Sequence, residues 1–266
     1  PRLKPLSISS GSLISPPNEI ASQGLAAIIN YFHSLEDTSE ISYLNEAKLV
    51  LIGRGLAGKT TLLKKLTIPG YQREKDLKST EGIEIEDWDV ELPLENSNSF
   101  RFNIWDFGGQ EKYDATHQFF ITEKTLYLFV TEARQESNYL DFDYWLNIVH
   151  MLSDDSPVIV VQNKIDIREK QLPTAKYRGQ FPNILDFVNV SCEDGYEHTI
   201  GDLISQVKIG IRKLPQVGDR LPKEWVDVRQ SLEEKKDDNY ISYQEYVDIC
   251  ALRGLSLDRA DFLSSY

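Results

Sequence analysis

The sequence predicts an α/β fold with a mostly parallel six-stranded sheet, helices on both faces and a short, truncated helical segment after it. Between residues 48 and 190, apolar runs of strand length alternate with stretches of helical periodicity. Most of the runs are almost continuously apolar, which is typical of parallel strands buried on both faces. The chain has 266 residues, of which 41% are apolar and 27% charged, so it is long and apolar enough to bury such a sheet.

The expected elements follow one another in a simple order. Six apolar runs of strand length lie at 49–52, 83–90, 100–104, 126–130, 158–161 and 187–190. Helical patterns lie at 60–66, 141–152 and 203–214. The stretch 83–100 departs from the parallel order, because its two strands flank a short turn that contains Pro and Asn. We expect these two strands to pair antiparallel at an edge of the sheet.

The region before the alternating core is different in composition. Residues 1–18 are rich in Ser and Pro and read as extended chain or turns. Apolar side chains then recur at helical spacing, at Leu25, Ile28, Ile29 and Phe32. This spacing predicts one short amphipathic helix ahead of the sheet.

The region after Pro215 is expected to hold three short helices. The first begins at Pro222, and the second at Ser242, where Glu245 three residues later completes a capping box. The third begins near Ser256 or Leu257. The chain starts with a residue other than Met and stops inside this last pattern, so we expect a fragment of a longer protein. We divide it into residues 1–45, 46–214 and 215–266.

The charge balance argues against nucleic acid as a partner. There are 29 basic and 42 acidic residues, a net charge of −13. A run of acidic side chains without an intervening base comprises Glu84, Glu86, Asp87, Asp89, Glu91 and Glu95. Contacts with a phosphate backbone or an anionic membrane surface would be made against this field. A local phosphate site remains compatible with it.

The composition also predicts a cytoplasmic protein without an integral membrane segment. Cys192 and Cys250 are the only cysteines, too few for a disulfide framework and typical of a reducing compartment. The longest charge-free apolar candidate, Ile20 to Leu35, has 16 residues and is interrupted by polar side chains. A membrane-spanning helix needs about 20 apolar residues.

A glycine-rich loop connects the first strand of the core to a helix. Its sequence is Gly53-Arg54-Gly55-Leu56-Ala57-Gly58-Lys59-Thr60-Thr61. Glycines allow backbone N–H groups to turn toward an anion, and the helix N-terminus adds its dipole. Lys59 would supply a cation for the β- and γ-phosphates, and Thr60 a hydroxyl for Mg²⁺. The strand before and the helix after are the context that this loop requires for phosphate binding.

A second motif is expected to choose the base. The strand at 158–161 ends in Gln162-Asn163-Lys164-Ile165-Asp166, at the carboxyl end where open α/β sheets bind ligands. The carboxylate of Asp166 would accept from N1–H and the exocyclic amine of guanine. Adenine offers no such donor pair, and an unpaired acceptor is costly. In this order after the phosphate loop, the motif predicts guanine.

A third motif lies between the other two, at the end of the strand 100–104. Asp106 fits a Mg²⁺ contact through water. Gly109 would place a backbone N–H beside the γ-phosphate, and Gln110 would hold the attacking water. Thr80 is the candidate for a second hydroxyl on Mg²⁺, with Ser79 as the competing choice.

Together the three motifs resemble a Ras-like small GTPase domain and, more narrowly, the Roc GTPase domain of Roco proteins. The resemblance covers about residues 46–214 and implies a P-loop GTPase fold that binds GTP or GDP with Mg²⁺. It implies that the loop at Ser191-Cys192 meets the guanine O6 through its backbone. In that family leucine-rich repeats precede Roc and a COR domain follows it. Residues 3–6 and 15–20 are similar to the end of such repeats, and 225–266 resembles the start of COR, which implies homodimerisation as one mode of partnership.

The predicted site is drawn from these motifs. Gln110, Lys59 and Thr80 are assigned to catalysis, and Thr60, Thr80 and Asp106 to the metal. The nucleotide-binding set comprises Gly53, Gly55, Leu56, Ala57, Gly58, Lys59, Thr60, Thr61, Gly109, Asn163, Lys164, Asp166, Ser191 and Cys192.

Three functions compete for this pattern. The leading interpretation is a Mg²⁺-dependent GTPase that acts as a regulatory switch. A P-loop ATPase or kinase is disfavoured by Asp166, and a nucleotide-binding scaffold with little turnover by Gln110 and Thr80. No arginine finger is evident in this chain, because Arg54 is expected to face outward and Arg134 is either a residue acting at a dimer interface or part of a surface ion pair.

Overall fold

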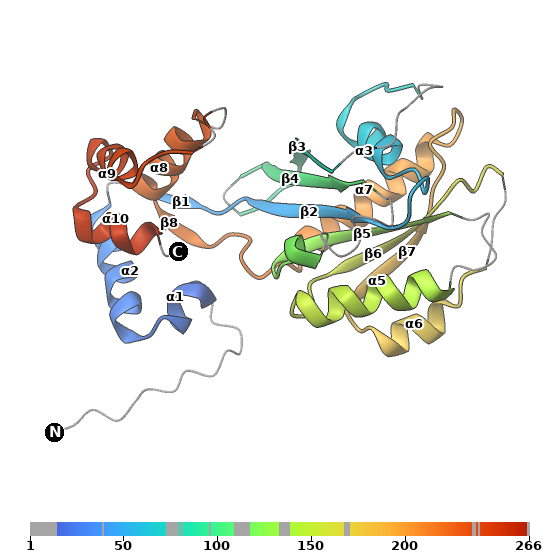
Figure 1. Ribbon diagram of the computed structural model, residues 1–266, viewed down its shortest axis with the longest axis horizontal. Helices are drawn as coiled ribbons and strands as arrows, with labels where there is room; N and C mark the ends of the chain where they lie inside the picture. The colour runs from blue at the N-terminus through green and yellow to red at the C-terminus, as the bar shows by residue number, and fades with distance from the viewer. Residues whose placement is uncertain are drawn as a thin grey trace. The chain divides into compact units, whose positions relative to one another are not determined.

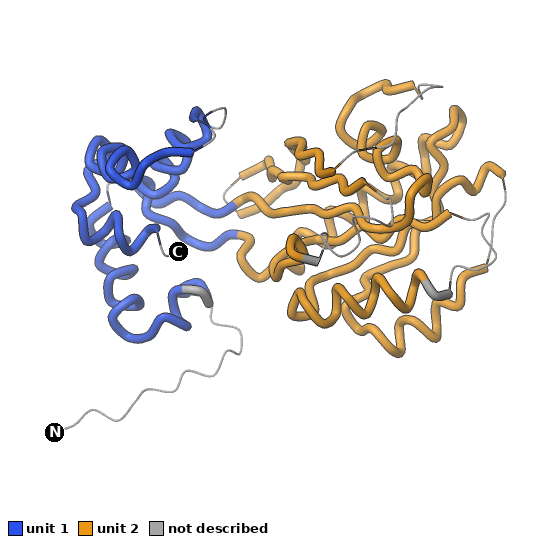
Figure 2. The backbone as a smooth tube through the Cα atoms, viewed as in Figure 1, with its two compact units in different colours: residues 1–44, 218–266 blue, residues 45–217 orange. Residues whose placement is uncertain are grey.

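The computed structural model describes residues 15–38, 40–72, 80, 82–95, 97–108, 118–132, 139–167, 171–235, 238 and 240–264. The chain divides into two compact units (Figure 2). Unit 1 combines Pro1–Leu44 with Gly218–Tyr266, and unit 2 is Asn45–Val217.

Unit 2 contains the six-stranded sheet, with strand order β3-β4-β2-β5-β6-β7 (Figure 1). The strands are Glu46–Ile52 (β2), Ile83–Glu91 (β3), Ser99–Phe107 (β4), Thr125–Glu132 (β5), Val158–Asn163 (β6) and Ile184–Asn189 (β7). All neighbours are parallel except β3 and β4, which pair antiparallel from Ile83↔Phe107 to Glu91↔Ser99. The predicted sheet and its antiparallel edge are therefore confirmed.

Helices cover both faces of this sheet, as the apolar runs predict. Lys59–Thr67 (α3) and Glu197–Ile211 (α7) contribute to the core on one face, and Tyr139–Leu152 (α5) and Thr174–Gln180 (α6) to the core on the other. Strand β2 shows why the runs are continuous: Leu49 and Leu51 lie in the first core, Val50 and Ile52 in the second, and each is at most 1% exposed. Burial on both faces leaves no polar side of the strand.

Several short elements were not predicted from the sequence, among them one helix and two strands. Helix α6 carries several polar residues and buries only Tyr177 among its described side chains, so it has no apolar stripe. Strands Ile41–Tyr43 (β1) and Arg220–Pro222 (β8) have three residues each and pair antiparallel, from Ile41↔Pro222 to Tyr43↔Arg220. Elements this short leave too few positions for a period to be recognised.

Unit 1 has one core built from both ends of the chain. Its helices are Asn18–Ser22 (α1), Leu25–Asp37 (α2), Lys223–Glu233 (α8), Tyr243–Leu252 (α9) and Leu257–Ser264 (α10). Ile20 and Tyr31 from the first segment share a core with Trp225 and Val228 from the second, and the rings of Tyr31 and Trp225 lie 6.3 Å apart. The two flanks that the sequence separates thus fold together.

The helix expected at Leu25 to Phe32 forms, but a different face of it is buried. Leu25, Ile29 and Phe32 are 53%, 45% and 41% exposed. The buried side of α2 carries Ala27, Tyr31 and Ser34. The Tyr31 hydroxyl donates to the carbonyl of Arg220 in β8 at 2.7 Å, which fixes this face toward the core of unit 1.

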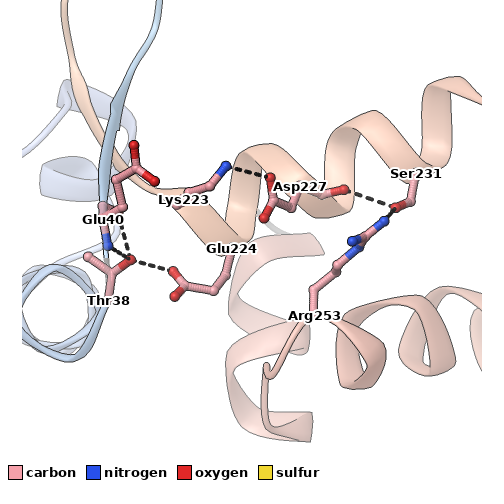
Figure 3. Close-up of polar contacts among 7 residues, drawn as sticks. All are labelled: Thr38, Glu40, Lys223, Glu224, Asp227, Ser231 and Arg253. Carbon is pink, nitrogen blue, oxygen red and sulfur yellow. Dashed lines mark hydrogen bonds and ion pairs between the residues drawn. The ribbon is translucent and has the colours of Figure 1, made fainter.

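Polar contacts also join the two segments of unit 1, as Figure 3 shows. The Thr38 hydroxyl donates to Glu224 at the start of α8 at 2.6 Å, and the backbone N–H of Lys223 donates to the carbonyl of Glu40 at 3.1 Å. Arg253 after α9 donates to the hydroxyl of Ser231 in α8 at 2.9 Å. These bonds link the end of α2 to α8, and α8 to the end of α9.

The predicted helix starts in unit 1 are confirmed. Helix α8 begins directly after Pro222, and α10 begins at Leu257. Ser242 and Glu245 form the predicted capping box of α9. Among the described residues, no helix combines the length and apolar character that crossing a bilayer requires.

Candidate nucleotide site

The glycine-rich loop lies between β2 and α3, at the carboxyl edge of the sheet. Gly53 has φ +133° and Gly58 φ +91°, a region that L side chains rarely adopt. A Cβ on Gly53 would collide with the carbonyl oxygen of Val130 in β5, and one on Gly58 with the side-chain amide of Asn163. Both glycines are therefore required by backbone conformation and by close approach.

Lys59 opens α3 and turns its side chain back over the loop. Its Nζ donates to the carbonyl of Gly53 at 2.8 Å and to that of Arg54 at 3.0 Å, and the residue is 6% exposed. The ammonium is therefore held within the loop, where a bound phosphate would be close to it. Thr61 follows in the first turn of α3.

The three predicted metal ligands come together at one point. The Thr60 hydroxyl donates to Asp106 Oδ2 at 2.5 Å, and that of Thr80 donates to the same oxygen at 3.2 Å. The two hydroxyl oxygens are 2.8 Å apart. The competing candidate Ser79 lies outside the described residues.

Asp106 is fully buried, and its environment suits a cation. Burial raises the pKa of its carboxyl group, against the opposing effects of hydrogen bonds from Thr60 and Thr80 and the charge of Lys59. Its Oδ1 is buried without a hydrogen-bond partner among the described residues. A carboxylate with one unsatisfied oxygen beside two hydroxyls is a set of hard oxygen ligands, which fits Mg²⁺.

The structure describes the motif that contains Asp106 as far as Gly108. Gly109 and Gln110 lie outside the described residues. Gly108 donates its N–H to the carbonyl of Gly82 at 2.9 Å, and a Cβ on it would collide with the carbonyl oxygen of Thr80. Gly108 was not among the predicted site residues, although a glycine two residues after Asp106 is a signal for close backbone approach.

Lys48 was not among the predicted site residues, but it contacts the chain beyond the Asp106 motif, at Phe120. Lys48 in β2 donates to the carbonyl of Phe120 at 2.6 Å, and its Nζ lies 4.1 Å from the ring centroid of Trp105. Burial lowers the pKa of Lys48 to about 8. The short 3₁₀ helix Gln118–Phe120 (η2) is thereby fixed to the sheet.

The base motif braces the phosphate loop. Asn163 Nδ2 donates to the carbonyl of Ala57 at 2.9 Å, and Lys164 Nζ donates to the carbonyl of Leu56 at 2.6 Å. Lys164 also pairs with Glu132 at the end of β5, with 3.2 Å between Nζ and Oε1. The base motif and the phosphate loop, about a hundred residues apart in sequence, are therefore joined by hydrogen bonds.

Asp166 is oriented by the loop after β7. The Ser191 hydroxyl donates to Asp166 Oδ1 at 2.6 Å and accepts the N–H of Glu193 at 3.1 Å. Cys192 is 8% exposed, and its Sγ lies 3.9 Å from Asn163 Oδ1. The residues predicted to read the base thus form one connected group at the ends of β6 and β7.

The chain is similar to proteins of one known family. The family model "Ras of Complex, Roc, domain of DAPkinase" matches residues 48–166. A Roc-COR-CHAT protease of Runella zeae is 35% identical over 237 residues, which covers 81% of this chain and 25% of that protein. The probable serine/threonine-protein kinase pats1 of Dictyostelium discoideum is 28% identical over 258 residues, covering 86% of this chain and 8% of the relative.

A solved structure is similar over most of the chain. It is that of Methanosarcina barkeri Roco2 RocCORdC bound to GDP, with a TM-score of 0.71 and 33% identity, and the match covers 85% of this chain and 67% of that one. The chain spans about a quarter of the length of the Roc-COR-CHAT proteases that it matches. The likeness extends beyond the GTPase fold, because unit 2 alone is shorter than the matched region.

Proposed function

Because the chain belongs to the Roco family and carries its Roc GTPase domain, we propose that unit 2 binds GTP and GDP with Mg²⁺ and hydrolyses GTP. Its role would be that of a regulatory switch within a longer protein. The observation that carries the proposal is the meeting of Thr60, Thr80 and Asp106, which come from three separate segments of the sequence.

The proposed roles follow from the contacts. Lys59 would neutralise charge on the β- and γ-phosphates from its place over the loop, and the loop's backbone N–H groups would bind the phosphate oxygens. Thr60 and Thr80 would offer their hydroxyls, and Asp106 its carboxylate, to Mg²⁺. Bound Mg²⁺ would supply neutralisation of the charge that grows on the transferred phosphoryl group.

At the other end, Asp166 would accept from the two donors of the guanine edge while the Ser191 hydroxyl keeps its carboxylate oriented. Gly109 and Gln110, outside the described residues, are proposed to meet the γ-phosphate and to hold the attacking water. GTP would then order the segments of Thr80 and Gly109, and hydrolysis would release them.

Turnover is proposed to be slow in the isolated chain. Arg54 is paired with Asp141 of α5, 2.7 Å from Nε to Oδ1, in agreement with the prediction that it faces outward. An arginine finger contributes roughly 10³ to 10⁵ to the rate in related GTPases. We propose that a second copy, associated through the COR-like region, or another partner supplies it. The thiols of Cys192 and Cys250 are both buried, which supports the proposal of a reducing, cytoplasmic location.

Single-turnover hydrolysis of GTP by the purified protein tests the proposal, followed over a wide range of protein concentration. A slow rate that rises with concentration, and competition of labelled GDP by GDP but not by ADP, are expected. Binding without any release of phosphate would favour the scaffold function instead. Equal competition by ADP would contradict the assignment of the base motif.

A further inference from the structure

We propose that the ion pair between Arg54 and Asp141 is a positioning contact that holds the first half of the phosphate loop for nucleotide binding. Neither residue belongs to the phosphate, metal or base sets described above. The inference rests on the proposed function, since it concerns how the same site is kept in shape.

The pair joins the loop to a helix through a short contact. Arg54 Nε lies 2.7 Å from Asp141 Oδ1, and Asp141 is in the first turn of α5. The Asp141 side chain is 14% exposed and that of Arg54 48%. Exposed ion pairs contribute little, but here the carboxylate is largely shielded, and the N-terminus of a helix favours a negative charge there. The helix therefore holds Asp141 as a fixed point for the loop.

Arg54 also contacts the lysine that would bind phosphate. Its carbonyl accepts from Lys59 Nζ at 3.0 Å and from the N–H of Ala57 at 3.4 Å. One residue thus links α5, through its side chain, to the ammonium of Lys59, through its backbone. A shift of about 1 Å in the Arg54 peptide would move an acceptor of that ammonium, and errors of this size cost up to about 10²-fold in rate.

The rest of the loop is braced by other groups. The carbonyls of Leu56 and Ala57 are bound by Lys164 and Asn163, so the second half is tied to the base motif. The first half is held by the packing of Gly53 on Val130 and by Arg54. Gly55 lies between the two halves without a side chain. Loss of the Arg54 contact is therefore expected to loosen the half of the loop that carries the Gly53 and Arg54 carbonyls, which accept from Lys59.

The test compares Arg54→Ala, Asp141→Asn and the double variant Arg54→Ala/Asp141→Asn with the parent protein. Both side chains line the same small hollow beside the loop, and Asp141→Asn removes the charge with little change in side-chain size. Each single variant is expected to release a fluorescent GDP analogue roughly threefold to tenfold faster and to slow single-turnover GTP hydrolysis by a similar factor. If the two side chains act as one contact, the double variant is expected to lose no more than either single variant.

Arg101→Ala serves as the matched control. Arg101 is also 48% exposed and pairs with Asp89 at 3.1 Å, but on the edge hairpin of β3 and β4. Its release and hydrolysis rates are expected to equal those of the parent. Arg54→Lys keeps a cation near Asp141 and is expected to lie between the parent and Arg54→Ala, and it replaces the alanine variant if that one fails to fold.

Two results would overturn the proposal. In the first, both single variants have a lower melting temperature, but their rates of GDP release and GTP hydrolysis lie within twofold of the parent. The ion pair would then only stabilise the fold. The second is a double variant whose losses are the sum of the single ones. A parent protein that retains no GDP analogue would refute the proposed function itself, and with it this inference.

Discussion

The two ends of the candidate nucleotide site are built in different ways. At the base end, Asn163 and Lys164 donate to carbonyls of the phosphate loop, and the Ser191 hydroxyl orients Asp166. At the phosphate end, Lys59 binds carbonyls of its own loop, and Asp106 binds Thr60 and Thr80. At the base end, side chains of one motif hold another part of the site. At the phosphate end, Thr60, Thr80 and Asp106 bond to one another, and Asp106 Oδ1 has no hydrogen-bond partner among the described residues.

Because of this difference, we expect the two ends to have different functions. A preorganised acceptor discriminates between bases because its hydrogen bonds are lost when the wrong edge is presented. A buried cluster of mutually bonded groups would have to exchange partners on binding phosphate and the proposed Mg²⁺, so we expect this end to be the one that responds to metal and to pH. We therefore expect substitutions at the base end to change which nucleotide binds, and substitutions at the phosphate end to change how long it stays and what becomes of it.

The largest effect is expected from Asp166→Asn. The amide would present a donor to the donors of guanine, so GDP binding should weaken by about 2 to 5 kcal/mol. Xanthosine diphosphate, which has a carbonyl at the corresponding position, should bind better than GDP. Competition titrations with both nucleotides measure this. Unchanged GDP affinity would remove Asp166 from the site and erase the contrast between the two ends.

Next in size is Gln110→Leu, which addresses the γ-phosphate side. Without an amide to hold water, single-turnover hydrolysis should fall roughly tenfold to a hundredfold while GTP affinity is retained. The parent protein and the variant should be compared at the same protein concentration, because a partner's arginine would affect both. An undiminished rate would mean that another group positions the water.

A smaller effect, about 1 kcal/mol on the free energy of GDP binding, is expected from Thr60→Ala. This change removes a proposed Mg²⁺ ligand and leaves Asp106 with one donor fewer. Release of GDP should be faster than in the parent and should depend less on added EDTA. Thr60→Ser keeps the hydroxyl and is the control. If EDTA leaves GDP release from the parent unchanged, Mg²⁺ does not contribute to retention.

The smallest expected effect concerns stability without nucleotide. Because burial raises the pKa of Asp106 in the folded protein, the folded state binds this proton more tightly than the unfolded chain does. The contribution is present below the unfolded pKa and is lost as pH rises through the folded one, so at neutral pH the buried carboxylate is a cost. Asp106→Asn should raise the free energy of unfolding of the nucleotide-free protein by up to about 1 kcal/mol at pH 7, with a smaller gain at lower pH.

Denaturant unfolding of the nucleotide-free variant and parent at several pH values measures this effect. The same substitution should weaken retention of GDP in the presence of Mg²⁺. A variant that is less stable than the parent at every pH would show that the bonds from Thr60 and Thr80 outweigh the burial of the charge.

Much of unit 2 was predictable, because its signals are local. Strand β2 is apolar on both faces, so its run of Leu49 to Ile52 indicates a central parallel strand without reference to any neighbour. The loop from Gly53 to Thr60 encodes its conformation in the residue types, since Gly53 and Gly58 have a φ that few other residues adopt. Motifs that follow a strand at fixed spacing therefore predicted residues that the structure brings close together.

The buried face of a helix in unit 1 could not be predicted from local sequence signals. The apolar positions Leu25, Ile29 and Phe32 of α2 are exposed while Tyr31 is buried against Trp225, almost two hundred residues later. Neither a helical period nor composition states which face will meet which partner.

By itself, the sequence determined the sheet, the phosphate loop, the base motif and the family, because each depends on residues that are neighbours along the chain. Only the tertiary structure decided that the two flanks share a core, that Lys164 and Asn163 brace the loop, and that Arg54 is held by Asp141. These contacts depend on which surfaces meet when the elements pack, and packing is set by the shape and burial of the whole fold.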